Sequence, residues 1–190
     1  MSKVFYKYLD KTETWPDLSS VIPSSLTYDD VYLVPQTSHI ASRSVVDTSV
    51  KFGPYTLSKP IISAPMDTIS GERMIRELAR LGGMGTLPRG DLEERIDICK
   101  RLSEEDIACM YAVSLKNGYE EAERLQAAGA KLVVVDVAHG GSVPAQELAQ
   151  KIKNKLGLIV VAGNIVTYTE GKSYLKHDID IAKVGVGPGG

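Results

Sequence analysis

LVVVDVAHGGSVPAQELAQKIKNKLGLIVVA, residues 132–162, contains one complete strand–helix–strand unit. Leu132 to Val135 is short, apolar and rich in β-branched residues, which is typical of a parallel strand buried on both faces. Pro144 to Leu156 has the length and composition of a helix, and Leu158 to Ala162 is the next apolar strand. Because a helical crossover joins the two strands, the stretch predicts an α/β fold with a parallel sheet.

The same alternation extends over the chain from Lys59 onward. Further strands are expected at residues 61–65, 83–87, 107–113 and 181–184, and further helices at 72–81, 91–102, 119–128 and 169–176. The tight spacing of these six strands fits a (β/α)8 barrel better than a doubly wound sheet. A complete barrel has eight strands and about 250 residues. The sequence therefore predicts a (β/α)8 TIM barrel that is truncated after about the sixth strand.

Residues 1–58 differ from the rest of the chain. They are interrupted by four prolines and two serine pairs, Pro16, Pro23, Pro35, Pro54, Ser19-Ser20 and Ser24-Ser25. We therefore expect two parts. Residues 1–58 form an irregular N-terminal extension that packs on the barrel, and residues 59–190 form the partial catalytic barrel.

Composition excludes several classes of partner. With 190 residues, 43% of them hydrophobic, the chain can bury a sizeable core. A formal charge of −2 gives no electrostatic footprint for nucleic acid, and no apolar run reaches the ~18 residues of a membrane span. Cys99 and Cys109 lack metal-site spacing and are expected to pack in the core. We expect a cytoplasmic protein without nucleic-acid or membrane partners.

Barrel enzymes carry their chemistry on the loops that follow the strands. Five such loops hold candidate residues: Pro65–Thr68, Pro88–Gly90, Asp136–Ser142, Ala162–Asn164 and Lys183–Gly190. Asp136 directly follows a buried strand and can accept hydrogen bonds from ribose hydroxyls, while His139 can titrate near neutrality. The plainer alternatives are a packed Met66, a solvated Arg89 and a histidine with a structural partner.

The last of these loops, KVGVGPGG at residues 183–190, is the strongest signal. Its glycines let the backbone approach a ligand closely, as a phosphate or ion site requires. No Ser-His-Asp order, H-E-x-x-H or Walker motif occurs in the chain. The residues alone thus predict a barrel that binds a phosphorylated, hydroxyl-bearing small molecule at its carboxyl-terminal rim.

Five segments together resemble the IMP dehydrogenase / GMP reductase family. In order they are LTYDDVYLVP at 26–35, SAPMDT at 63–68, DVAHG at 136–140, AGNIVT at 162–167 and KVGVGPG at 183–189. The resemblance implies an NAD(P)-dependent purine nucleotide oxidoreductase on a (β/α)8 barrel, usually a homotetramer. In such enzymes a cysteine just beyond the glycine-rich loop attacks C2 of the purine, and hydride passes to or from the nicotinamide.

The resemblance also implies site residues. Substrate contacts fall on Ala64, Met66, Asn164 and Gly189. Cofactor contacts, for NAD or NADP, fall on Asp136, Val137, Ala138, Gly185, Val186 and Gly187. The carbonyls of Gly187 and Gly189 would coordinate K⁺, a hard cation that prefers oxygen ligands. No catalytic residue lies in the chain, because the nucleophilic cysteine is expected beyond Gly190.

Family features divide between two activities. No CBS-domain insertion separates Arg89 from Ile107, which favours GMP reductase (GMP to IMP with NADPH). In contrast, LGGMG at 81–85 and DVAHG at 136–140 look more like IMP dehydrogenase (IMP to XMP with NAD), which is the expected activity. Thr86–Arg89 replaces a histidine-bearing family segment, and Gly190 stands where the family has serine. The alternatives are GMP reductase, an inactive truncated barrel and, least favoured, an FMN-dependent oxidase.

Overall fold

The structure is a computed structural model that describes residues 32–185; residues 1–31 and 186–190 lie outside the described residues. All described helices and strands belong to one compact unit that begins at Ile40. No described helix has the length and apolar character needed to cross a membrane.

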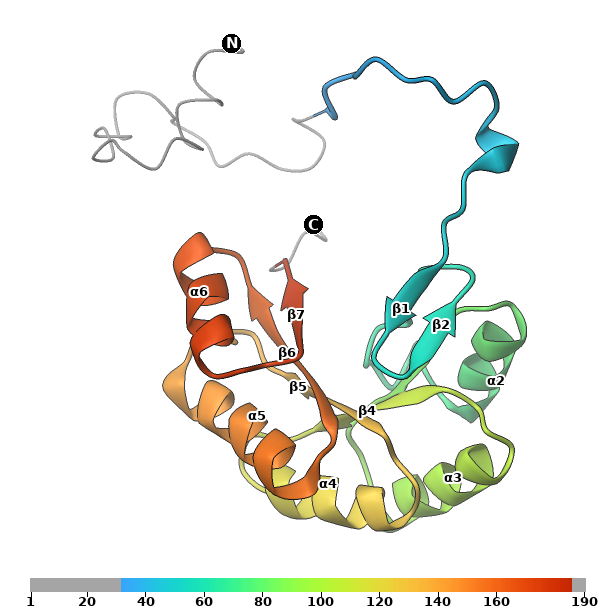
Figure 1. Cartoon of the computed structure of the whole chain (residues 1–190). Helices are drawn as coiled ribbons and strands as arrows, with labels where there is room; N and C mark the ends of the chain where they lie inside the picture. The colour runs from blue at the N-terminus through green and yellow to red at the C-terminus, as the bar shows by residue number, and fades with distance from the viewer. Residues whose placement is uncertain (1–31, 186–190) are drawn as a thin grey trace. The chain divides into compact units, whose positions relative to one another are not determined.

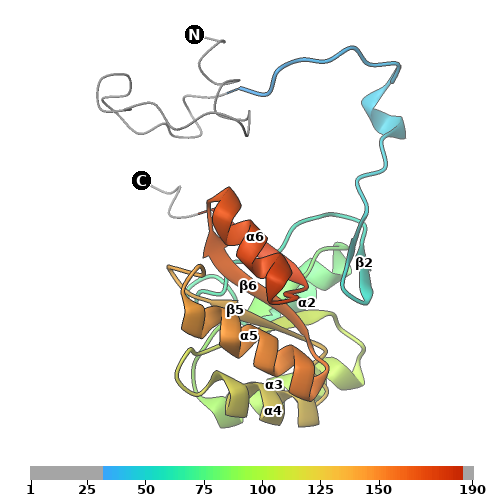
Figure 2. The same cartoon turned by 60° about the vertical axis from the view of Figure 1, so that its left-hand side comes forward.

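A parallel sheet of five strands forms the centre of this unit. The strands are β3 (Gly85–Leu87), β4 (Cys109–Val113), β5 (Leu132–Asp136), β6 (Ile159–Ile165) and β7 (Ile181–Val184), and they lie side by side in chain order. The connecting helices are α3 (Leu92–Glu104), α4 (Gly118–Ala127), α5 (Val143–Leu156) and α6 (Tyr168–Lys176). Figures 1 and 2 show them along the outer face of the curved sheet. This arrangement confirms the predicted α/β fold and is consistent with part of a barrel.

The first expected strand, residues 61–65, forms only an isolated parallel bridge, between Ile62 and Met84. The Ser63 N–H donates to Met84 O at 3.1 Å, and the Met84 N–H donates to Ile61 O at 3.0 Å. Pro65 ends this segment and lacks the N–H that the next hydrogen bond of the ladder would need, so the pairing does not continue past Ser63. The predicted strand thus lies beside β3 but is shorter than expected. Helix α2 (Glu72–Arg80) follows it.

Residues 1–58, expected to be irregular, contain a short 3-10 helix, η3 (Arg43–Val45), and an antiparallel hairpin of β1 (Val50–Phe52) and β2 (Tyr55–Leu57). The hairpin turns at Gly53, whose φ of 59° suits glycine. Leu57 is buried against the inner face of the sheet, with the side chains of Met84, Met110, Ala112, Leu132, Val134 and Val161. The hairpin therefore covers the inner face, while the helices cover the outer face.

Strand alternation produces these two apolar layers. Along β4, Met110 and Ala112 point to the inner layer, whereas Cys109, Tyr111 and Val113 belong to the outer layer beneath the helices. Both cysteines are buried and form no disulfide, as predicted for packing residues, and burial raises the pKa of the Cys109 thiol to about 12.

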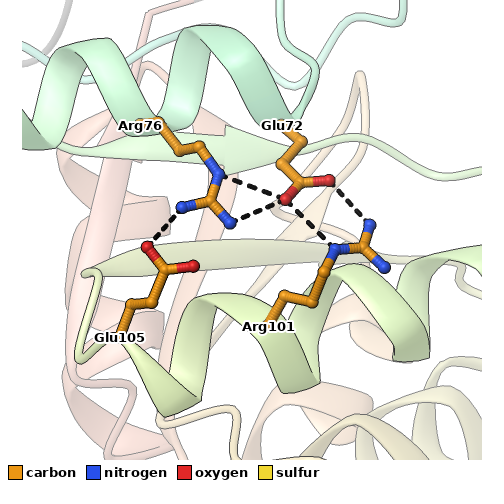
Figure 3. Close-up of polar contacts among 4 residues, drawn as sticks. All are labelled: Glu72, Arg76, Arg101 and Glu105. Atoms are coloured by element: carbon orange, nitrogen blue, oxygen red, sulfur yellow. Dashed lines mark hydrogen bonds and ion pairs between the residues drawn. The ribbon is translucent and has the colours of Figure 1, made fainter.

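A charged cluster joins α2 to α3 on the outer surface (Figure 3). Glu72 accepts hydrogen bonds from Arg76 at 2.8 Å and from Arg101 at 2.7 Å, and Arg76 also pairs with Glu105 at 2.5 Å. The two guanidinium groups lower the pKa of the Glu72 carboxyl to about 2. The cluster therefore joins neighbouring helices through a carboxylate that stays ionised well into the acid range.

Candidate functional site

The candidate site lies where β5, β6 and β7 end. Asp136 is the last residue of β5 and lies opposite Gly163 of β6, which lies opposite Lys183 of β7. This register brings Lys183 Nζ to 2.5 Å from Asp136 Oδ1, across 47 residues of sequence. Both side chains are only partly buried, so the ion pair is accessible from solvent. The described residues offer no hydrogen bond to Asp136 Oδ2, which leaves one carboxylate oxygen for a ligand.

The loop after β5 is hydrogen-bonded to the end of β6. The Val137 N–H donates to Gly163 O at 2.8 Å, the Asn164 N–H donates to Val137 O at 2.7 Å, and the Gly140 N–H donates to Asn164 O at 2.8 Å. The Gly163–Asn164 peptide bond is cis. Asn164 Oδ1 is buried and has no hydrogen-bond partner among the described residues. A buried acceptor of this kind is costly unless a ligand or water pairs with it.

Glycine is required at two points of this contact. A Cβ at Gly163 would lie 2.5 Å from Lys183 O, and a Cβ at Gly140 would lie 2.7 Å from the backbone of Gly163. These backbone contacts cannot relax by moving a flexible side chain, so the two loops pack this closely only with glycine.

Two buried side chains from the helices donate hydrogen bonds to backbone carbonyls of the same loop. The Tyr174 hydroxyl of α6 donates to Gly140 O at 3.1 Å, and Gln146 Nε2 of α5 donates to Gly141 O at 2.8 Å. The Ser173 hydroxyl donates to Gln146 Oε1 at 2.6 Å. Sequence reasoning missed this group. The one feature that could have indicated these hydrogen bonds is Gln146, a polar residue buried on the otherwise apolar face of α5.

His139 lies on the surface of the loop, with 74% of its side chain exposed, and its Nδ1 is 3.6 Å from Glu170 Oε1. The other oxygen of Glu170 accepts hydrogen bonds from the Val166 and Thr167 N–H groups, which lower the pKa of this carboxyl. Glu170 also completes a capping box with Thr167 at the start of α6. His139 thus lies beside a carboxylate without a hydrogen bond to it, and Ser142, the N-cap of the next helix, makes no side-chain cap bond. Arg89 is exposed.

Met66 lies in a tight turn after the bridged segment. Its carbonyl accepts hydrogen bonds from the Ile69 and Ser70 N–H groups, at 3.0 and 2.8 Å. Ser63 Oγ ties this turn to β3, because it accepts from the Thr86 N–H at 2.9 Å and from the Ser70 hydroxyl. Met66 is about half exposed, so a flat ligand can reach it.

The described contacts join Asp136, Val137 and Asn164 in one cluster. They connect neither Ala64 nor Met66 to it. Ala138 is exposed in the loop after Asp136. Gly185 donates its N–H to Ile165 O at 2.8 Å and has a φ of 120°, which favours glycine. The remaining predicted positions, Val186, Gly187 and Gly189, lie outside the described residues.

The family model and the similar known proteins indicate the same family. The family model for the IMP dehydrogenase / GMP reductase domain matches residues 25–190. The chain is similar to GMP reductase of Streptococcus agalactiae serotype V, with 35% identity over 164 residues that cover 85% of this chain and 50% of that protein. It is also similar to GMP reductase of Ligilactobacillus salivarius, with 34% identity over 166 residues that cover 85% and 51%. The chain thus spans about half the length of these relatives.

Proposed function

The chain belongs to the IMP dehydrogenase / GMP reductase family, and we propose that it forms part of a purine nucleotide oxidoreductase, with conversion of GMP to IMP as the favoured reaction. Two observations favour this direction. The similar curated proteins carry the name GMP reductase. Also, β3 ends at Leu87 and α3 begins at Leu92, so a short loop stands where a regulatory domain pair would be inserted.

The observation that carries the proposal is the polar cluster at the ends of β5, β6 and β7. Lys183 fixes one oxygen of Asp136 and leaves the other free, at a rim where parallel α/β folds bind ligands. Asn164 adds a buried acceptor without a partner, and the glycines admit close approach to the backbone. These groups suit the ribose hydroxyls of a nicotinamide nucleotide, which are hydrogen-bond donors.

In this proposal each residue makes one contact, either with a bound nucleotide or with a residue that binds it. Asp136 accepts a hydrogen bond from a ribose hydroxyl, and Lys183 keeps that carboxylate oriented. Asn164 Oδ1 accepts from a donor of the nucleotide. Met66 packs its thioether against the purine ring. A nicotinamide nucleotide, NAD or NADP, supplies hydride-transfer chemistry when bound.

Other parts of the proposal rest on the family resemblance. The carbonyls of Gly187 and Gly189 would hold K⁺, Val137, Ala138 and Gly185–Gly187 would line the cofactor, and Ala64 and Gly189 would contact the substrate. The nucleophilic cysteine would follow Gly190, so the 190-residue chain alone is expected to give no turnover. The homotetramer and the cytoplasmic location stay predictions.

IMP dehydrogenase is the second candidate. The sequences LGGMG at 81–85 and DVAHG at 136–140 favour it, because they look more like the dehydrogenase. Product analysis of the full-length protein separates the two activities. GMP with NADPH should give IMP and ammonia, whereas oxidation of IMP with NAD⁺ and no conversion of GMP would identify a dehydrogenase. If neither reaction occurs, the proposed function is wrong.

Asp136→Asn tests the assigned role directly, because it keeps the shape and removes the charge. We expect the KM for the nicotinamide cofactor to rise by about tenfold, the effect of one charge-assisted hydrogen bond. Asp106→Asn is the matched control, since Asp106 lies before β4, at the opposite end of the sheet, and pairs only with Lys131 among the described residues. An unchanged KM in Asp136→Asn would remove Asp136 from the cofactor site.

A further inference from the structure

Glu121 is the centre of a hydrogen-bond network that the candidate site does not include. The residue lies in the first turn of α4, and only 14% of its side chain is exposed. Its Oε2 accepts from Arg95 Nη1 and from the Ser114 N–H, each at 3.2 Å, and its Oε1 accepts from the Ser114 hydroxyl at 2.5 Å. The Ser114 hydroxyl oxygen in turn accepts from the Asn117 N–H at 3.1 Å. One carboxylate thus holds both ends of the loop 114–117, which follows β4.

Arg95 binds this carboxylate from the neighbouring helix α3. It is 4% exposed, and its Nη2 donates to Ala112 O on β4. Its Nε is buried and has no partner among the described residues. A buried ion pair is weak evidence for stability, and a buried donor without a partner costs free energy. Stability alone therefore gives a poor reason for this pair, whereas the position of the loop gives a direct one.

The loop 114–117 lies beside Asp136 at the rim. Val113, the last residue of β4, lies opposite the residue before Asp136, so Ser114 and Asp136 are neighbours on adjacent strands. β6 and β7, which carries Lys183, lie on the other side of β5. Adjacent strands are only about 4.8 Å apart, so a nucleotide bound at Asp136 has this loop as its neighbour on the side away from Lys183.

We propose that Glu121 is a positioning residue of the cofactor site, because it holds the loop 114–117 as the wall beside Asp136. The inference rests on the proposed function, in which a nicotinamide nucleotide binds at Asp136. Glu121 acts through its hydrogen bonds to Ser114 and not by touching the nucleotide. The middle of the loop, residues 115–116, is exposed and therefore accessible to the nucleotide. Loss of the network should weaken cofactor binding and leave the chemical step unchanged.

Glu121→Gln in the full-length protein tests this role, because it keeps the shape of the side chain and replaces the carboxylate with a neutral amide. Without nucleotide, amide hydrogen exchange at residues 114–117 should become faster, since the bonds that hold the loop are weakened. The KM for the nicotinamide cofactor should rise about three- to tenfold at an unchanged kcat, which corresponds to one weakened hydrogen bond.

Asp180→Asn is the matched control. Asp180 likewise accepts from a backbone N–H and from a cation, namely from the Val160 N–H at 2.9 Å and from Lys153 Nζ at 2.8 Å. It directly precedes β7, so it lies at the opposite end of the sheet from the rim. We expect Asp180→Asn to keep the parent KM for the cofactor.

A double variant separates positioning from a purely structural role. Arg95→Met with Glu121→Leu replaces the ion pair with apolar side chains, which is often neutral or stabilising, but it removes the bonds to Ser114. We expect its cofactor KM to stay raised, whereas a structural role alone would return the KM to that of the parent.

A parent KM in Glu121→Gln, a parent KM in the double variant, or equal rises in Glu121→Gln and Asp180→Asn would overturn the inference while the proposed function stands. If the parent protein converts neither GMP nor IMP, the proposed function fails and this inference fails with it. The parent and the variants therefore report on the two proposals separately.

Discussion

Replacing Tyr174 with phenylalanine tests whether the helices hold the loop after β5. The hydroxyl is the donor to Gly140 O at 3.1 Å, and only 3% of Tyr174 is exposed. Tyr174→Phe keeps the ring but leaves a buried carbonyl without this partner, which costs about 1–3 kcal/mol. For a chain of this size the melting temperature should fall by roughly 2–12 °C.

The pH dependence gives the same prediction a second readout. Burial raises the pKa of the Tyr174 hydroxyl from its ordinary value of 10.0 to about 12. A raised pKa means that the folded state favours the protonated form. The stabilisation is therefore complete below about pH 10 and is lost between about pH 10 and 12. The parent chain should lose stability in this window more steeply than Tyr174→Phe does.

Urea unfolding, followed by circular dichroism at several pH values, measures both effects. Tyr119→Phe is the control, because the Tyr119 ring contacts Lys151 while its hydroxyl has no hydrogen bond among the described residues. If Tyr174→Phe and Tyr119→Phe have the same free energy of unfolding, the Tyr174 hydroxyl does not stabilise the fold through the buried Gly140 carbonyl.

Three further substitutions test other parts of the structure. Glu72→Gln should lower the free energy of unfolding at neutral pH but change it little near pH 2. The lowered pKa of Glu72 means that its stabilising contribution is present above about pH 4.5 and is lost as the pH falls toward 2. Equal losses at both pH values in acid titrations would contradict this. Gly163→Ala should cost about 1–3 kcal/mol in urea unfolding, since its Cβ meets the Lys183 backbone, whereas Gly171→Ala, with open space around it, should be neutral or stabilising. Thr86→Val should raise the melting temperature, because the buried Thr86 hydroxyl has no partner among the described residues; a fall would show that water or a ligand pairs with it.

The sequence predicted the strands and helices whose residues form a clear apolar run or a clear helical pattern. The run from Leu132 to Val135 became β5, and the expected helix 72–81 is α2 at Glu72–Arg80. The hairpin was missed because its strands have three residues each, too few for alternation to be recognised, and Pro54 between them reads as a loop signal. The strand at 61–65 was overestimated, because its apolar residues suggested a full strand whereas Pro65 at its end lacks the N–H that would extend the ladder.

The sequence predicted where the candidate site lies, but not which of its side chains pair with one another. Loops after parallel strands share one rim, so Asp136 and Asn164 could be placed together from sequence. The Lys183–Asp136 pair depends on the register of three strands, which no local pattern encodes. Gln146 and Tyr174 were missed because they bond to backbone carbonyls, and any residue can supply a carbonyl.

A crystal structure of the full-length protein with a nicotinamide nucleotide and a purine monophosphate bound would show directly whether the cluster of Asp136, Asn164 and Lys183 binds the cofactor. We expect a ribose hydroxyl within hydrogen-bond distance of Asp136 Oδ2, with Lys183 still on Oδ1. We also expect the purine ring to lie against Met66. Nucleotides bound elsewhere, with Asp136 exposed to solvent in the complex, would contradict this assignment.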